Sequence, residues 1–231
     1  MWVRVNPGKS LTKDIHATVL PALSGICLPK VRSPQQVQAV DGLLGQAEAR
    51  CGMPPGSIKL LALVESAAGV LAAQAIAQEP RVVRLGLGEL DLCAELGIEP
   101  SEDEHELIGV RTQVVLASAA AGLDPPVAPL ATDVRDLEAL RHSTEALRRI
   151  GFGARWAIHP AQVPVINRVF TPSQEAVEAA RRLIDRFEAA LATGRGVLLD
   201  DGGRMIDEAV VRSARRTLSQ AAAAEATRAK G

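Results

Sequence analysis

The chain has 231 residues, of which 47% are hydrophobic and 23% are charged, and its formal net charge is −1. These fractions are those of a folded globular protein, so they exclude a disordered chain, a collagen-like fibre and a disulfide-stapled miniprotein. The balanced charge and an aromatic content of 2% argue against a surface that binds nucleic acid.

Short apolar runs alternate with helical patterns along most of the chain. Several of these runs are continuous instead of alternating with polar residues, which is typical of strands in a covered parallel sheet. The predicted strands are Trp2–Asn6, Gly25–Val31, Ile58–Glu65, Val82–Gly88, Pro126–Leu130 and Arg155–His159.

Helices are predicted between these strands from the spacing of apolar residues and from capping residues. They are Pro34–Arg50, Ala67–Gln78, Glu104–Ala121 and a helix that Asp133 caps and Gly151 ends. Alternating strands and helices indicate βαβ units, in either an open doubly wound sheet or a (β/α)8 barrel. A dinucleotide-binding sheet should carry Gly-x-Gly-x-x-Gly after its first strand. The Gly86-Leu87-Gly88 segment has only two of these glycines, so this signal is weak.

The pattern changes after His159. The segment Thr171-Pro172-Ser173-Gln174 is interpreted as a capping box with proline at the first helical position, and it opens a long helix that Gly194 ends. A hairpin is predicted over Gly196–Ile206, around an Asp-Asp-Gly-Gly turn, and a final helix begins near Glu208.

Three further features concern the compartment. The cysteines Cys27, Cys51 and Cys93 are odd in number and form no CxxC motif, so we interpret them as buried free thiols. The apolar runs are shorter than the ~18 residues of a membrane span. No signal-peptide pattern follows Met1, and we expect a cytoplasmic protein.

Polar side chains recur at the carboxyl ends of the predicted strands, where barrel enzymes place their chemistry. Two strand-end carboxylates converge in a barrel, and their oxygen atoms are ligands that Mg²⁺ prefers. An arginine on the same face could hold a substrate carboxylate through a bidentate contact. A metal beside an arginine suits a small oxo-acid that develops negative charge during reaction. The strand-end residues are Arg4, Asn6, Lys30, Glu65, Asp91 and His159.

Each of these residues also has a purely structural interpretation. Glu65 and Asp91 could lie at helix N-termini, where a carboxylate interacts well with the helix dipole. Arg4 and Lys30 could be solvated charges at strand ends, and His159 could orient a loop.

Six short motifs resemble, in order and spacing, the citrate lyase β-subunit-like branch of the HpcH/HpaI aldolase family, which also contains malyl-CoA and citramalyl-CoA lyases. The resemblance extends from Val3 to about Leu218. The motifs are Trp2-Val3-Arg4-Val5-Asn6, Leu28-Pro29-Lys30, Leu63-Val64-Glu65-Ser66-Ala67, Gly88-Glu89-Leu90-Asp91-Leu92, Ile158-His159-Pro160-Ala161-Gln162 and Gly203-Arg204-Met205-Ile206-Asp207.

The resemblance implies a (β/α)8 barrel, usually trimeric, that cleaves or forms a carbon–carbon bond in a β-hydroxy acyl thioester. It implies that Glu65 and Asp91 hold Mg²⁺ and that Arg4 binds the carboxylate of a 2-keto acid. Asn6, Glu65 and His159 would contribute to the substrate site, with His159 on the thioester side. Asp207 would act as acid and base on the acetyl carbon.

Members of this family begin with two further βα units, so this chain starts at what corresponds to the third strand. We expect a partial TIM barrel with about six of eight strands over residues 1–170. Residues 171–231 are expected to form a helix–hairpin–helix lid and oligomerisation segment. A late start of the chain is the favoured explanation, beside a gap that a partner chain fills and a degenerate remnant.

Three functional hypotheses remain open. The first is a Mg²⁺-dependent lyase that acts on a citryl-, malyl- or citramalyl-like thioester of CoA or an acyl-carrier protein, as a homotrimer without nucleic-acid or membrane partners. A class II pyruvate aldolase that acts on free hydroxy-oxo acids is the close alternative. The Met205-Ile206-Asp207 ending and the Ile158-His159 pair favour the lyase. The third hypothesis is a non-catalytic truncated remnant.

Overall fold

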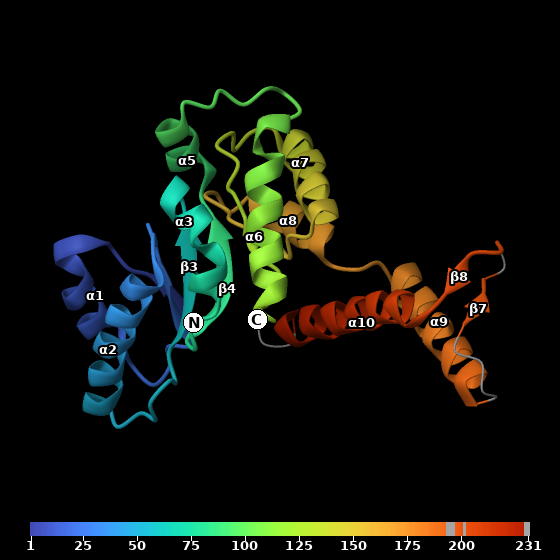
Figure 1. Ribbon diagram of the computed structural model, residues 1–231, viewed down its shortest axis with the longest axis horizontal. Coiled ribbons are helices and arrows are strands. Elements are labelled where there is room, and N and C mark those ends of the chain that lie inside the picture. Colours follow the sequence, from blue (N-terminus) through green and yellow to red (C-terminus); the bar gives the residue numbers. More distant parts are fainter. Residues whose placement is uncertain (193–196, 201, 229–231) are drawn as a thin grey trace. The chain divides into compact units, whose positions relative to one another are not determined.

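The computed structural model in Figure 1 describes residues 1–192, 197–200 and 202–228. The chain divides into two compact units, Met1–Ile166 and Asn167–Gly231. The expected roles of the second unit as a lid and an oligomer contact stay predictions.

The first unit is built on one parallel sheet. Its strands follow chain order across the sheet, each parallel to the next. A doubly wound sheet reverses its strand order, whereas this sheet curls in one direction into a half-barrel, which confirms the predicted barrel-type α/β class. The strands are β1 (Trp2–Arg4), β2 (Gly25–Leu28), β3 (Lys59–Val64), β4 (Val82–Leu87), β5 (Val127–Ala128) and β6 (Ala154–Arg155).

Helices connect these strands, and α4 and α6 contact β4 (Figure 1). Helix α8 (Gln162–Phe170) crosses from the first unit into the second. The other helices of the first unit are α1 (Leu11–Thr18), α2 (Pro34–Arg50), α3 (Ala67–Leu71), α4 (Ala73–Ala77), α5 (Glu89–Leu96), α6 (Ile108–Ala120) and α7 (Leu137–Ile150), with 3-10 turns η1 (Gly8–Ser10) and η2 (His105–Leu107).

Alternation along β3 separates the two faces of the sheet. Leu60 and Val64 belong to the large core beneath the helices, whereas Leu61 and Leu63 belong to a smaller cluster on the opposite face. Because successive strand residues point to opposite faces, Glu65 continues the second set. The alternation therefore places Glu65 at the carboxyl end of β3, on the face away from the large core.

Several predicted bounds are wrong. The strand predicted at Arg155–His159 ends at Arg155, because the amide oxygen of Gln162 accepts the backbone N–H groups of Ile158 and His159 and holds them in a turn. The helix predicted over Ala67–Gln78 is interrupted at Ala72, which gives α3 and α4.

Two predicted caps are displaced along the chain. Asp136, not Asp133, caps α7 by accepting the Ala139 N–H at 2.8 Å, while Asp133 accepts the N–H of Arg135 in the preceding turn. Near the start of α9 (Gln174–Ala192), the Ser173 hydroxyl accepts a helical N–H at 3.2 Å, so the capping box predicted two residues earlier is wrong.

The second unit contains α9, the predicted hairpin and α10 (Glu208–Arg228), with Phe187, Ile206 and Val211 buried in its own core. The hairpin pairs β7 (Leu198–Leu199) with β8 (Met205–Ile206). Gly194, predicted to end the long helix, and Gly196, predicted to open the hairpin, lie outside the described residues.

Two expectations about the environment of the chain can be compared with the structure. Within the described ranges, no helix combines the length and the hydropathy that crossing a bilayer requires. All three cysteines carry free thiols, but only Cys27 is buried, whereas Cys51 and Cys93 are half-buried.

A buried ion pair ties α2 to the start of β4. The Glu48 carboxylate has no exposed surface and accepts from the Arg81 guanidinium at 2.6 and 3.0 Å and from the N–H groups of Ile58 and Gly56. Asp41 accepts from the same guanidinium. Burial raises the pKa of Glu48, but the hydrogen bonds from Arg81 and the two backbone groups outweigh it and hold that pKa below its ordinary value.

We expect Glu48→Gln to lower the free energy of unfolding by about 3 kcal/mol at pH 7, because it leaves the buried Arg81 charge without its main partner. The contribution of Glu48 is present above the pKa of the unfolded chain and is lost as the pH falls through the lower pKa of the folded state. Urea unfolding at neutral and acid pH should therefore show a smaller acid-induced loss in the variant. The exposed Glu102→Gln is the matched control, and equal stability of the two variants would contradict this role.

Candidate active site

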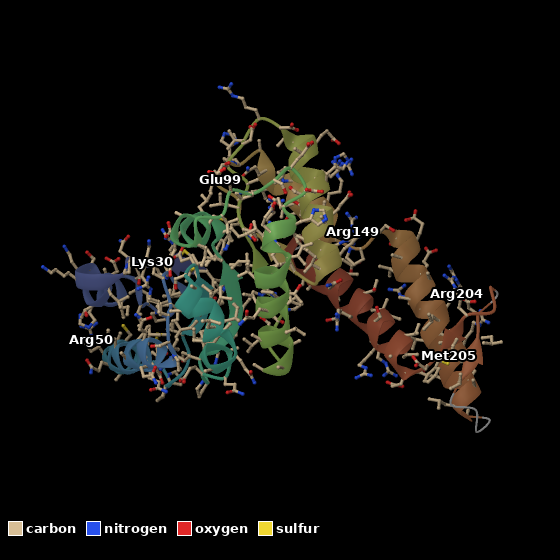
Figure 2. The ribbon with its side chains drawn as sticks, turned by 45° about the horizontal axis from the view of Figure 1, so that its top comes forward. Lys30, Arg50, Glu99, Arg149, Arg204 and Met205 are labelled. Carbon is tan, nitrogen blue, oxygen red and sulfur yellow. The ribbon has the colours of Figure 1, made fainter. Side chains whose placement is uncertain are left out.

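The carboxyl ends of β1 to β4 bring Arg4, Lys30, Glu65 and Asp91 together. Lys30 follows β2 and Glu65 follows β3, while Asp91 lies in the first turn of α5 beyond β4. Figure 2 labels Lys30 on this edge of the sheet, near α5. Four of the six strand-end residues that the sequence singled out thus converge, as the barrel geometry predicts.

Lys30 contacts both carboxylates through different groups. Its backbone N–H donates to Oε1 of Glu65 at 2.7 Å, and its Nζ donates to Oδ2 of Asp91 at 2.5 Å. Lys30 has φ +56°, in the left-handed region that residues other than glycine seldom adopt. The next residue returns to the sheet, since the N–H of Val31 donates to the carbonyl of Leu63 at 3.1 Å.

Glu65 is half-buried, and its surroundings hold the pKa of its carboxyl group above the ordinary value. Burial raises its pKa, and the charge of Asp91 adds to the rise. The N–H of Lys30 and the charges of Lys30 and Arg4 act in the opposite direction, without cancelling it. Glu65 is therefore a carboxylate that further positive charge would stabilise.

Gly88 makes room for the Glu65 side chain. A Cβ atom at this position would lie 2.8 Å from both Cβ and Oε2 of Glu65, closer than non-bonded atoms approach. The backbone N–H of Gly88 is fixed by the carbonyl of Val64 at 2.8 Å. The glycine therefore serves close packing, a role that its place in a partial Gly-x-Gly pattern did not reveal.

The structural interpretations of the carboxylates also apply. Glu65 immediately precedes Ser66, which caps α3 by accepting the Gly69 N–H at 3.2 Å. Asp91 occupies the first turn of α5, where its charge interacts favourably with the helix dipole. A helix N-terminus and a cation site use the same negative charge, so the two roles are compatible.

Arg4 ends β1 and is exposed. Its charge lowers the pKa of Glu65 and that of the neighbouring Cys27, which places the guanidinium within electrostatic reach of both. Burial nevertheless raises the pKa of Cys27 to about 12, and the charge of Glu65 adds to the rise. Cys27 is thus a neutral thiol at physiological pH.

Asn6 and His159 make local contacts. The backbone and side-chain N–H groups of Asn6 both donate to Oδ2 of Asp14, each at 2.8 Å, which ties the end of β1 to α1. His159 is exposed, and its Nδ1 accepts the N–H of Ala161 at 3.2 Å. These contacts orient loops, and a part in substrate binding stays a prediction for both residues.

Asp207 lies in the second unit, immediately before α10. Its Oδ1 accepts the N–H groups of Ala209 at 2.9 Å and Val210 at 3.0 Å, so Asp207 is the N-cap of that helix. The carboxylate is half-buried. The structure thus gives Asp207 a structural role, and its acid–base role stays a prediction.

An arginine that the sequence reasoning missed organises the segment carrying Asp91. Arg111 of α6 is buried and holds both carboxylate oxygens of Glu89, at 2.6 and 2.7 Å. It also donates to Glu104 at 2.8 Å. Since Glu89 begins α5, this cluster fixes the helical turn that presents Asp91. The available signal was that Arg111 is the one charged residue of α6.

Gln162 is a second positioning residue. It is fully buried, and its Oε1 accepts the N–H groups of Ile158 at 2.9 Å and His159 at 3.3 Å. Its Nε2 donates to the carbonyl of Ala131 at 3.1 Å. In the sequence, Gln162 stood out only as the last residue of a motif, because the pattern does not show which side chain holds the turn.

The donor set suits a hard divalent cation. Among the residues that the structure describes, no cluster of three or more His, Cys, Asp and Glu side chains is arranged around a common metal position. Glu65 and Asp91 nevertheless supply oxygen donors, and the ammonium of Lys30 already lies on Asp91. Mg²⁺ commonly uses one or two carboxylates and takes water or substrate oxygens for its other positions, so the pair fits this ion.

Comparisons with known proteins connect this chain to a family. Residues 1–160 match the HpcH/HpaI aldolase/citrate lyase family. The citrate lyase subunit beta of Escherichia coli K12 is 31% identical over 222 residues, which span 95% of this chain and 73% of that protein. A (3S)-malyl-CoA thioesterase of Cereibacter sphaeroides is 35% identical over 210 residues, which span 91% of this chain and 69% of that protein.

Solved structures agree with the fold. The CitE protein of Mycobacterium tuberculosis, in complex with magnesium, acetoacetate and coenzyme A, is 29% identical with a TM-score of 0.73, over 96% of this chain and 78% of that one. A citrate lyase of Burkholderia xenovorans LB400 has a TM-score of 0.80 at 22% identity, over 96% of this chain and 72% of that one, and supports the fold alone.

We expect Gly88→Ala to displace the Glu65 carboxylate, because the added methyl group would occupy its position. Mg²⁺ affinity measured by calorimetry should fall by roughly 10-fold, as is typical when a group that supports a metal ligand is changed. Gly42→Ala, in α2 with open space around it, is the control and should bind as the wild type does. Unchanged affinity in Gly88→Ala would show that this contact does not set the position of Glu65.

Proposed function

Because the chain belongs to the HpcH/HpaI aldolase/citrate lyase family and is a carbon–carbon lyase, we propose that it cleaves a β-hydroxy acyl thioester into an acyl thioester and a 2-keto acid with the help of Mg²⁺. The observation that carries this proposal is the convergence of Glu65 and Asp91 on Lys30, with the charge of Arg4 within electrostatic reach.

Negative charge develops at two places in this reaction, first on the deprotonated hydroxyl oxygen and then on the enolate of the acyl thioester. In the cleavage direction, the hydroxyl group loses its proton and its carbon becomes the ketone of the keto acid. The electron pair of the broken carbon–carbon bond passes to the acyl thioester, whose enolate then takes up a proton. A bound Mg²⁺ would act as a Lewis acid that stabilises negative charge developing on oxygen, with Glu65 and Asp91 as its protein ligands.

The residues divide this work. Glu65 and Asp91 hold the metal, and the planar fork of Arg4 binds the carboxylate of the keto acid. Asn6 and His159 line the substrate site, and Asp207 transfers the proton at the acyl carbon. Support for CoA as the carrier comes from the malyl-CoA thioesterase relatives and from the CitE complex that contains coenzyme A.

Hydrolysis of a thioester is a second candidate, since relatives at 33–35% identity are named (3S)-malyl-CoA thioesterases. The two activities give different products from the same substrate. A lyase releases a 2-keto acid and an acyl thioester, whereas a thioesterase releases the intact hydroxy acid and free thiol. A class II aldolase would instead act on free 4-hydroxy-2-oxo acids.

The deciding experiment incubates the protein with malyl-, citramalyl- and citryl-CoA, with Mg²⁺ and with a chelator, and separates the products by mass spectrometry. Mg²⁺-dependent formation of a keto acid and an acyl-CoA supports the lyase. Intact hydroxy acid with free CoA supports the thioesterase. No turnover of any substrate, free hydroxy-oxo acids included, would favour a non-catalytic remnant.

We expect Glu65→Gln to weaken Mg²⁺ binding at least ~10-fold, because the neutral amide keeps an acceptor for the Lys30 N–H but loses the charge that attracts the cation. Isothermal calorimetry measures the change. Glu99→Gln, at an exposed glutamate labelled in Figure 2, is the control. Equal Mg²⁺ affinity in the wild type and Glu65→Gln would remove Glu65 from the ligand set.

Arg4→Lys keeps the positive charge but loses the planar guanidinium fork. We expect it to weaken keto-acid binding roughly 10-fold, in line with the loss of one charge-assisted hydrogen bond, and to leave Mg²⁺ affinity nearly intact. Titration with oxaloacetate in the presence of Mg²⁺ checks this. The control Arg50→Lys lies at the exposed end of α2. A keto-acid affinity that does not change would exclude Arg4 from the carboxylate site.

Asp207 can be tested with two variants, since its capping role and its acid–base role respond differently. Asparagine caps helices about as well as aspartate, so Asp207→Asn should keep the wild-type melting temperature and lose proton exchange at the acyl carbon. Asp207→Ala should have a lower melting temperature and should also lose the proton exchange. Deuterium exchange from solvent, followed by NMR, measures the proton transfer. Normal exchange in Asp207→Asn would assign the residue to capping alone.

The proposed homotrimer adds a test of whether Asp207 acts on a neighbouring subunit. Mixing Asp207→Asn with Arg4→Ala should then restore part of the activity, because hybrid oligomers contain some sites with both residues intact. A mixture that exchanges subunits but stays inactive would place both residues in the same subunit's site. The cytoplasmic location also stays a prediction.

A further inference from the structure

Lys30 makes two hydrogen bonds to the carboxylate pair, one through its backbone N–H and one through its side-chain ammonium. The N–H that Glu65 accepts belongs to a backbone turn. The Nζ atom, which donates to Asp91, lies at the end of a flexible side chain. The side chains of Lys30 and Asp91 are 55% and 49% exposed, respectively. The first contact is therefore fixed by the fold, whereas the second can be exchanged without refolding.

The turn itself has other anchors. Val31 bonds to β3 through the carbonyl of Leu63 at 3.1 Å, and Arg32 pairs with Glu95 of α5 at 3.6 Å. The Lys30 ammonium is thus one of two cationic contacts from this loop to α5. If the ammonium left Asp91, Arg32 would still hold the loop against α5, and the N–H of Lys30 would still hold Glu65.

The ammonium of Lys30 offsets the negative charge of the two carboxylates, Glu65 and Asp91. Glu65 and Asp91 repel each other, and Lys30 and Arg4 are the positive groups that oppose this repulsion at Glu65. A Mg²⁺ ion would lie ~2 Å from a ligating oxygen of Asp91. An ammonium hydrogen-bonded to the same carboxylate would then lie within a few ångströms of a divalent cation, where the two positive charges repel strongly.

We propose that the ammonium of Lys30 is a built-in counter-cation, which occupies the cation position at Asp91 until Mg²⁺ binds and displaces it. The backbone N–H of Lys30 keeps Glu65 in place throughout. The inference rests on the proposed function only in taking Glu65 and Asp91 as the metal ligands. It adds a residue that aligns the ligands before the metal arrives and that lowers the apparent metal affinity by competing for Asp91.

The test compares Mg²⁺ binding to the full chain and to Lys30→Met, which keeps most of the aliphatic side chain and removes the ammonium. Calorimetry should show binding at least threefold tighter in the variant, because no ammonium has to leave. Its melting temperature in chelator should be lower than that of the wild type, and Mg²⁺ should raise it by more. Lys30→Arg keeps a cation and should bind Mg²⁺ no more tightly than the wild type.

Two further variants guard the interpretation. Lys59→Met, at the opposite end of β3, makes the same change in net charge away from the site and should leave Mg²⁺ affinity unchanged. Lys30→Asn also removes the ammonium, and asparagine tolerates the left-handed conformation of this position. It should bind Mg²⁺ more tightly than the wild type even if Lys30→Met does not fold.

Mg²⁺ affinity that is unchanged or weaker in both Lys30→Met and Lys30→Asn would overturn the inference, since the ammonium would then not compete with the metal. An equal gain in Lys59→Met would overturn it as well, by assigning the effect to net charge. Failure of the proposed function is a separate result, namely the absence of keto acid among the products of the wild type. Absence of Mg²⁺ binding in every form would overturn both.

Discussion

The site depends on one constraint, the parallel pairing of the strands in chain order. Parallel strands place all their carboxyl ends on one edge of the sheet, so residues distant in sequence meet there. The alternation of side chains then divides the residues of β3, because Leu60, Ala62 and Val64 belong to the large core and Leu61 and Leu63 lie on the other face. Glu65 reaches the site because it follows β3 in the second register.

Buried ion pairs fix the positions of the elements near the site. Arg111 anchors the start of α5 through Glu89, and Arg81 anchors β4 to α2 through Glu48. In both cases a buried guanidinium is satisfied by carboxylates from another element, which is the condition under which such a charge is tolerated inside a protein. Buried ion pairs thus fix α5, which carries Asp91, and β4, which pairs with the strand that precedes Glu65.

The sequence predicted the strand-end residues better than the contacts between them. Apolar runs that end in Arg4 or near Glu65 are visible in one dimension, because strand periodicity and polarity are local properties. The left-handed turn at Lys30 and the close packing of Gly88 on Glu65 are not, since both depend on how neighbouring strands approach. The errors at Asp133 and Thr171 have a similar cause: several capping residues lie close together, and tertiary packing selects one.

Cys27 bears on how much negative charge the carboxyl edge of the sheet carries. Its thiol lies within electrostatic reach of Glu65, and an ionised sulfur there would add a second negative charge beside that carboxylate. Burial raises its pKa to about 12, so the sulfur stays protonated and neutral near pH 7. The apolar packing around one cysteine therefore keeps a further negative charge away from Glu65, whose ionised form is already opposed by the charge of Asp91.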